Sequence, residues 1–368
     1  MITLRFTVVT LRSFLAAIRV ELEEAAEADG CTRAAAGMTG GAVKGHRGAP
    51  HAPTVRRGNL MSHSPRRIRV TIAAAAAMGL GCAALTALPT AAASEQVAVG
   101  ATLFDDFNYT SYTDPAIGAH GWNIRSNSGG PGVPGATWAP QNVTFAAEGT
   151  NSVMNLETST AGTGESTKHA EVLTKAMKFK NGTYAARVKF SDAPISGPDG
   201  DHLVQAFFTI NDLTAPMADD YAEYDFEYLP NGGWGEPANI LYTTSWETYR
   251  PDPWEAVNQH SEVRASYAGW HDLVLTIDNS RITYYIDGRR FARHGARYLP
   301  ERPMSINFNQ WLIDLAGQGS TTARAYHQKV DYVLHVKDKV LAPAQVIAKV
   351  AAYRAAGTRF EDTVPGGQ

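Results

Sequence analysis

Residues 223–229 read EYDFEYL, in which acidic and aromatic side chains alternate from Glu223 to Tyr228. Successive side chains of a β-strand point to opposite faces of the sheet. In a strand, Glu223, Asp225 and Glu227 therefore share one face, and the aromatic residues between them share the other. We expect the aromatic face to enter a hydrophobic core and the acidic face to line a surface.

Three carboxylates on one strand face work against folding, because like charges repel and acidic residues are poor strand formers. A solvated edge strand would tolerate them, and that is the structural alternative. Glycoside hydrolysis gives them a use, since it needs two carboxyls that flank the scissile bond, ~5–5.5 Å apart in a retaining enzyme. Strand positions four apart are separated by ~13 Å at about 3.3 Å per residue. Glu223 and Glu227 would therefore have to converge over a concave sheet.

Short β-rich runs separated by Gly, Pro, Asn and Asp continue on both sides of this segment, from about residue 97 to residue 336. The Asp287-Gly288 pair between two such runs predicts a hairpin. Many strands with turn signals between them are typical of an all-β sandwich or barrel. Residues 342–356 instead show apolar side chains at helical spacing, with Pro343 near the start and Gly357 after the end. They predict one C-terminal helix packed on the outside of the domain.

Composition narrows the function classes. The chain has 368 residues, is 44% hydrophobic and 19% charged, and carries a formal net charge of -3. Such a balance is ordinary for a globular protein and gives no basis for nucleic-acid binding. Both cysteines, Cys31 and Cys82, precede the expected start of the mature protein, so we expect no disulfide and no cysteine chemistry in the folded part. The sequence contains no H-E-x-x-H zinc motif, P-loop or dinucleotide fingerprint.

The N-terminal region indicates secretion. Residues 61–93 combine a Met, three arginines, an apolar run and Ala91-Ala92-Ala93, the order of a signal peptide. An uncleaved membrane anchor and a lipoprotein cut at Cys82 are the alternatives. We interpret residues 1–60 as a non-native extension from a misplaced gene start, 94–341 as the catalytic domain and 342–368 as a C-terminal helix and tail. The mature protein is expected to be extracellular, without a membrane anchor, and monomeric.

The acidic motif resembles the E-x-D-x-E signature of glycoside hydrolase family 16. Segments such as Asn181–Lys189, Trp270-His271-Asp272 and Val330–Val333 are similar to fold markers of that family in the same order. The resemblance spans roughly residues 104–336. It implies a concanavalin-like β-jelly-roll sandwich of two antiparallel sheets, and endo-acting, retaining cleavage of a 1,3-1,4- or 1,3-linked β-glucan.

By the same resemblance, Glu223 is the nucleophile, Asp225 the assisting acid and Glu227 the general acid/base. The spacing is the unbulged form found in lichenases and xyloglucan-active enzymes. Catalysis would need no cofactor. Some members bind a structural calcium ion on the convex side, for which Asp331 is the candidate ligand. Leu173 stands where lichenases have an arginine, so the lichenase specificity does not carry over directly.

Sugar rings stack on aromatic faces, which directs attention to aromatic residues near the acidic segment. The predicted substrate-binding residues are Trp234, Trp246, Trp311, Phe208 and Asn309. Trp246 could face the cleft or the core. We expect Trp138 to be structural and Trp270 to lie in the core.

Three other functions fit the same residues. A non-catalytic glycan-binding jelly roll would not need the glutamate pair. A transglycosylase would use the same chemistry with a sugar acceptor in place of water. A carboxylate metal site could combine Asp219 and Asp220 with the strand acids.

Overall fold

The computed structural model describes residues 100–366. The predicted extension (1–60), the predicted signal peptide (61–93) and both cysteines lie outside the described residues, so these interpretations stay predictions. In the described range, no helix has the length and apolar character needed to cross a membrane.

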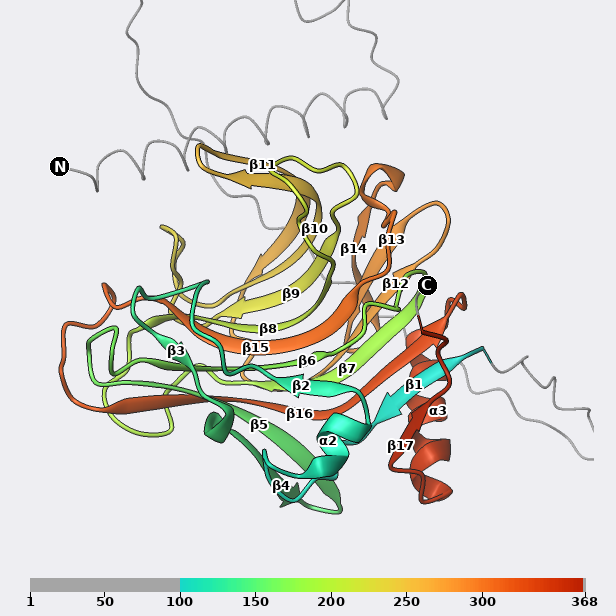
Figure 1. The fold of residues 1–368 in the computed structure, drawn as a ribbon, viewed down its shortest axis with the longest axis horizontal. Helices are drawn as coiled ribbons and strands as arrows, with labels where there is room; N and C mark the ends of the chain where they lie inside the picture. Colours follow the sequence, from blue (N-terminus) through green and yellow to red (C-terminus); the bar gives the residue numbers. More distant parts are fainter. Residues whose placement is uncertain (1–99, 367–368) are drawn as a thin grey trace, which may run out of the picture. The chain divides into compact units, whose positions relative to one another are not determined.

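One sheet carries the acidic segment. Its strands, in spatial order, are β2 (Trp122–Ile124), β6 (Lys168–Thr174), β15 (Ser305–Asp314), β8 (His202–Ile210), β9 (Glu223–Leu229), β10 (Ile240–Pro251) and β11 (Trp254–Arg264). All these pairings are antiparallel. The sheet bends strongly towards β10 and β11, so that its outer face is the inside of a curve (Figure 1). We call it the concave sheet.

The second sheet covers the other side of the core, and we call it the convex sheet. Its strands, in spatial order, are β4 (Val143–Glu148), β5 (Asn151–Thr160), β16 (Arg324–Lys337), β7 (Gly182–Phe190), β12 (Gly269–Ile277), β13 (Ile282–Ile286) and β14 (Arg289–His294). Beyond β5, the second half of β16 pairs with β1 (Thr102–Asp105), which pairs with β17 (Phe360–Asp362). The short β3 (Thr137–Trp138) runs parallel to β6.

The core lies between the sheets and is rich in aromatic rings. Phe207, Phe226 and Phe308 stack across three neighbouring strands, with ring centroids 6.0 and 5.0 Å apart. Tyr284 of the convex sheet meets Phe226 edge-on at 5.3 Å. These rings are almost completely buried. Truncation of such a ring to alanine typically costs about 3–5 kcal/mol, so this contact layer holds the two sheets together.

The structure confirms the predicted all-β jelly-roll sandwich of two antiparallel sheets with a C-terminal helix. That helix, α3 (Pro343–Ala355), packs Val346 and Val350 onto the outside of the convex sheet. The predicted hairpin is β13–β14, whose turn residues Asp287 and Gly288 both have positive φ, as a type I′ turn requires.

Several short elements were not expected from the sequence. After α3 the chain adds the edge strand β17, where the prediction had only a tail. The remaining short elements are α2 (Pro115–Ala119), η1 (Pro140–Asn142) and η2 (Ala296–Tyr298).

Candidate active site

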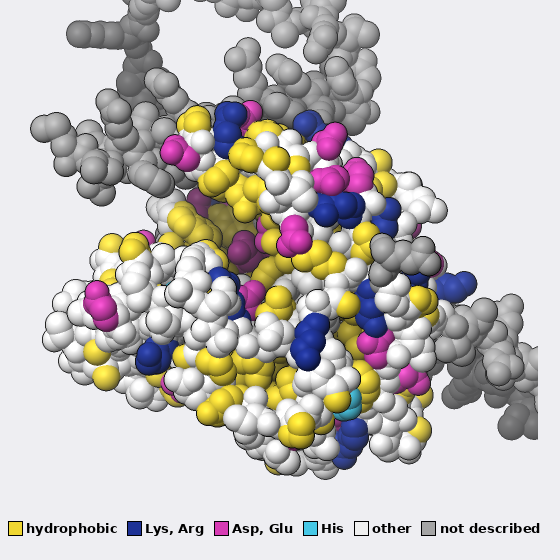
Figure 2. Space-filling model, viewed as in Figure 1, with side chains coloured by type: hydrophobic (Ala, Val, Ile, Leu, Met, Phe, Trp, Pro, Cys, Tyr) yellow, Lys and Arg dark blue, Asp and Glu magenta, His cyan; other side chains and the backbone are white. Residues whose placement is uncertain are grey.

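Strand β9 places the three acids on the open face of the concave sheet, as the alternation predicts. Tyr224, Phe226 and Tyr228 are at most 1% exposed and belong to the core. Glu223 and Glu227 are partly exposed on the opposite face, and Asp225 between them is buried. The register of β9 with β8 and β10 is continuous, so the strand is unbulged. Figure 2 shows a hollow in this side of the molecule, with acidic side chains inside it and hydrophobic ones along its walls.

Hydrogen bonds hold two of the acids. The Tyr221 hydroxyl donates to Glu223 Oε2. Trp246 Nε1 donates to Asp225 Oδ2 at 2.9 Å, and the Asp225 and Glu223 carboxyls are hydrogen-bonded to each other. Among the described residues, no hydrogen bond or ion pair reaches the carboxyl of Glu227. The Glu227 carboxyl is therefore available to exchange a proton with a ligand that binds in the hollow.

The pKa values of all three acids are raised. Burial is the main cause, because it removes the charged form from water. Repulsion from Glu223 adds to the rise for Asp225 and Glu227, whereas hydrogen bonds from Tyr221 and Asp225 oppose it for Glu223. Within residues 100–366, none of the main causes of these shifts is a cation. The three carboxyls thus keep their protons to a higher pH than isolated carboxyls do. Glu223 is the one whose negative charge is stabilised by two side-chain hydrogen bonds, from Tyr221 and Asp225.

Cross-strand pairing shows which predicted residues line the same face. Asp225 lies opposite Phe208 on β8, and Glu223 lies opposite Trp246 on β10. Glu227 lies opposite Ala206, and Ala206 lies opposite Asn309 on β15. Phe208, Trp246 and Asn309 are therefore all brought to the acidic row. Trp246 faces the hollow, which resolves the two orientations that the sequence left open.

Asn309 has a further property. Its side chain is 6% exposed, and its Oδ1 has no hydrogen-bond partner. A buried acceptor without a partner is costly unless a ligand or water supplies a donor. This oxygen is suited to accept from a hydroxyl group near Glu227.

Aromatic side chains flank the acids along the strand direction. Beyond Glu227, Trp311 lies next to Trp234, with ring centroids 5.8 Å apart. Trp234 is 50% exposed. Its loop is held close to β15 by Gly233, where any Cβ would come within 2.5 Å of the Ile313 side chain. Trp234 therefore offers an exposed ring on this side, whereas Trp311 is buried in a hydrophobic cluster beside it, and the sugar-binding role of both stays a prediction.

The opposite end holds residues that the sequence analysis missed. Beyond Glu223, Trp246 meets Tyr249 and Trp254 with ring centroids 6.1 and 6.3 Å apart. Trp254 opens β11 and is 47% exposed. A bulge after Trp246 turns the β10–β11 hairpin and brings these rings together. Tyr249 and Trp254 follow Trp246 by three and eight residues, and this close run of aromatic residues is the sequence signal that could have found them.

An arginine also lines this face, from an unexpected place. Arg125 Nη1 bonds Glu171 Oε2 at 2.7 Å, and its Cζ lies 4.1 Å from the Trp138 ring centre. Glu171 lies opposite Asn309 in the register. Leu173 supplies no charge, but Arg125 brings a guanidinium to the same strand from the segment after β2. Trp138 is buried, as expected of a structural residue.

The predicted metal ligands are engaged elsewhere. Asp331 lies on the convex sheet, where it pairs with Arg354 at 2.7 Å, and Asp220 pairs with Arg302 at 2.7 Å. Among residues 100–366, no group of three or more His, Cys, Asp or Glu is arranged to hold a metal ion. This geometry therefore does not support a metal site formed by Asp219, Asp220 and the acids of β9. The structural calcium ion at Asp331 stays a prediction.

Comparisons with known proteins give likenesses of fold. No family model matches the chain, and no curated protein matches it. Among solved structures, a prokaryotic β-1,3-1,4-glucanase (lichenase) derived from a mouse hindgut metagenome is 18% identical, with 64% of this chain and 99% of that chain covered and a TM-score of 0.46. A family 16 endo-glucanase from Bacteroides ovatus is 17% identical, with 62% and 98% covered and a TM-score of 0.46.

A laminarinase from Flavobacterium sp. UMI-01 is 14% identical, with 64% and 98% covered and a TM-score of 0.46. Of these three, the Bacteroides ovatus enzyme is named as a member of family 16. At these identities the likeness concerns the fold, and function has to be argued from the site itself.

Proposed function

We propose that this protein is an endo-acting glycoside hydrolase that cleaves a β-glucan with retention of configuration. The observation that carries the proposal is the row Glu223, Asp225 and Glu227, which shares proton-binding capacity in a hollow flanked by aromatic rings. A polysaccharide that lies over β9 would have aromatic surfaces on both sides of the acids. The polymer class follows from the motif's resemblance to family 16.

In the first step, protonated Glu227 gives its proton to the glycosidic oxygen as that bond breaks. The Glu223 carboxylate attacks the anomeric carbon and forms a glycosyl ester. In the second step, Glu227, now a carboxylate, takes a proton from water, and the water oxygen displaces Glu223 from the anomeric carbon. Two inversions give net retention.

Asp225 and Tyr221 have supporting roles in this scheme. Both hydrogen-bond the Glu223 carboxyl and favour its anion. Trp246 donates to Asp225 and orients it. Glu227 lacks such donors, so its neutral form is favoured, as a general acid requires.

The proposal extends to the whole chain. We propose a secreted enzyme, cleaved near Ala93–Ser94, that acts as a monomer on 1,3-1,4- or 1,3-linked β-glucan. The signal-peptide pattern and the sequence resemblance support this.

The test is the release of reducing ends from barley β-glucan and laminarin by the purified full-length protein. Glu223→Gln keeps the size and hydrogen-bonding shape of the side chain but removes the nucleophile, so activity should fall by at least about 10⁴-fold. NMR of the first product should show the β-anomer. Binding without any release of reducing ends would replace the hydrolase by a glycan-binding protein, and longer products from oligosaccharides would indicate a transglycosylase.

A further inference from the structure

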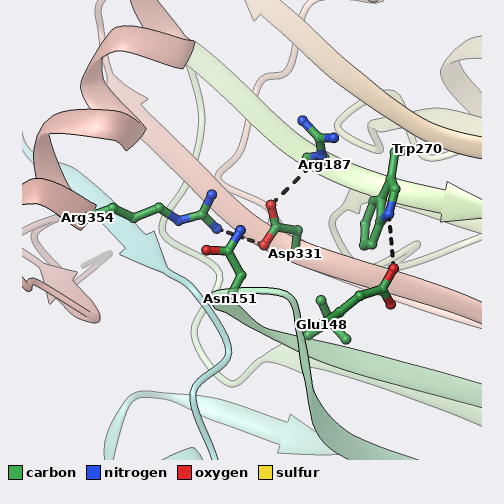
Figure 3. A pocket seen from close by; sticks show the side chains of 7 residues that line it. Glu148, Asn151, Arg187, Trp270, Asp331 and Arg354 are labelled. Atoms are coloured by element: carbon green, nitrogen blue, oxygen red, sulfur yellow. Dashed lines mark hydrogen bonds and ion pairs between the residues drawn. The ribbon is translucent and has the colours of Figure 1, made fainter.

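The outer face of the convex sheet holds a separate cavity of about 250 Å³. Figure 3 shows side chains from the β4–β5 hairpin, from three other strands and from α3 turned towards it. Its lining residues are Glu148, Asn151, Val153, Arg187, Trp270, Asp331 and Arg354. None of them belongs to the concave sheet.

The charges around this pocket are largely paired. Two arginines and two acids line it, and the acids are already paired. Glu148 accepts from Lys329 at 2.7 Å, and Asp331 accepts from Arg354 at 2.7 Å. The Lys329 hydrogen bond, more than any other contact, lowers the pKa of Glu148. The full cluster has four cations (Arg187, Lys189, Lys329 and Arg354) and three acids (Glu148, Asp272 and Asp331), joined by ion pairs. Because these charges already have partners, a neutral polar ligand can enter without bringing a countercharge.

Trp270 corrects the sequence analysis. It was expected in the core, but it stands half-buried on the outer face of β12, in register with Lys189 of β7. Arg187 Cζ and Lys189 Nζ lie 5.5 and 5.8 Å from its ring centre. Its Nε1 donates to Glu148 at 3.3 Å, which fixes the ring against the pocket (Figure 3). A rigid indole at a polar cavity is the element that recognises the apolar face of a sugar ring.

Hydrogen-bonding capacity remains for a ligand. Arg354 Nε is buried and has no partner. Arg187 is 41% exposed, and its ion pairs to Asp272 and Asp331, at 3.8 and 3.9 Å, are longer than hydrogen bonds. Planar guanidinium and amide groups around an aromatic ring match the neighbouring hydroxyls of a pyranose, whose oxygens both donate and accept.

We propose that this convex-face pocket is a second, non-catalytic carbohydrate site that holds one sugar unit of a neutral polysaccharide. It goes beyond the proposed function, and only the choice of β-glucan as the polymer rests on that function. Because the pocket and the hollow lie on opposite sheets, one long polymer or two neighbouring chains could engage both, and the second contact would raise the effective concentration of substrate at the first. The pocket also gives α3 a role, since that helix supplies Arg354.

The experiment uses the full-length Glu223→Gln protein as parent, so that polymer is not consumed, and measures its affinity for barley β-glucan and laminarin by gel electrophoresis with embedded polysaccharide. Adding Trp270→Ala should weaken binding at least fivefold. Adding Asn151→Ala, a milder change at the hairpin turn, should weaken it about twofold. Tyr112→Ala removes an aromatic side chain that is 42% exposed outside both sites and should have no effect.

In the otherwise wild-type protein, Trp270→Ala should leave kcat/KM on a short glucan oligosaccharide within twofold. The proposal is overturned if both Trp270→Ala and Asn151→Ala bind the polymers as the parent does, or if Tyr112→Ala weakens binding equally. Failure of the hydrolase proposal gives a different pattern, in which the wild-type protein releases no reducing ends whatever the binding data show.

Discussion

The two outer faces of the sandwich both present acids, but in opposite electrostatic settings. On the concave face, Asp225 and Glu227 have raised pKa values because the sheet shields them from water and Glu223 repels their charged forms. On the convex face, Glu148 has a lowered pKa because Lys329 and Lys189 bond it. Paired acids serve structure and recognition. Acids kept close together without cations cost stability, which makes chemistry their natural explanation.

After the nucleophile variant Glu223→Gln, the largest expected effect concerns Glu227, whose carboxyl has no hydrogen bond or ion pair within residues 100–366. Glu227→Gln should lower kcat/KM on β-glucan by roughly 10²–10⁴-fold, the usual contribution of a general acid. Wild-type activity should fall as the pH rises through the raised pKa of Glu227, because the acid then loses its proton. The variant should lack this alkaline fall on an aryl glycoside whose leaving group needs no proton. If the pH profile of the variant keeps the alkaline fall, a residue other than Glu227 is the general acid.

The next largest effect should distinguish the aromatic residues of the two faces by their influence on KM. Trp254→Ala removes an exposed ring at the Glu223 end of the hollow and should raise KM for long β-glucan roughly two- to tenfold, as expected for about 0.5–1.5 kcal/mol of aromatic contact. The value of kcat should change little, since the ring is remote from the reacting bond. The matched variant Trp270→Ala should leave KM for a short oligosaccharide unchanged. Equal effects of both variants on that oligosaccharide would contradict the division of roles.

Stability should respond in opposite directions on the two faces. Asp225→Asn keeps an acceptor for Trp246 but removes a buried carboxyl that must take up a proton on folding, so it should raise the free energy of unfolding by about 0.5–2 kcal/mol. An acid whose folded pKa is raised lowers stability as pH rises above its unfolded pKa. The gain should therefore be present at pH 8 and vanish near pH 3. Thermal denaturation at both pH values measures it, and a lower Tm at pH 8 would argue against the electrostatic strain.

Glu148→Gln should have the smallest effect, and it should lower the free energy of unfolding where Asp225→Asn raises it. A lowered folded pKa means that Glu148 contributes stability above its unfolded pKa and loses it as pH falls. Its side chain is about one-third exposed, so solvent screening limits the loss in the variant to less than about 1 kcal/mol at pH 7. Urea denaturation at pH 7 and pH 3 should show the difference only at pH 7. An increase in stability would mean that the convex acids are strained as well.

Much of the architecture could be predicted from local patterns. Alternation in residues 223–229 decided which side chains enter the core, because the two faces of a strand are set by covalent geometry. The Asp287-Gly288 turn and α3 likewise depend on neighbours in the chain. Trp270 was misplaced because alternation on a half-buried strand does not say whether its aromatic residue faces core or solvent.

The composition of the two sites was decided by the tertiary structure. Arg125 reaches Glu171 across 46 residues, and Arg354 reaches Asp331 only because α3 folds back onto the convex sheet. Trp254 joins Trp246 through a bulge that no residue pattern announces. The sequence by itself determined the strand, its acidic face and the fold class, since these follow from local periodicity. Which groups surround those acids depends on non-local strand pairing, and so does every pKa that the chemistry uses.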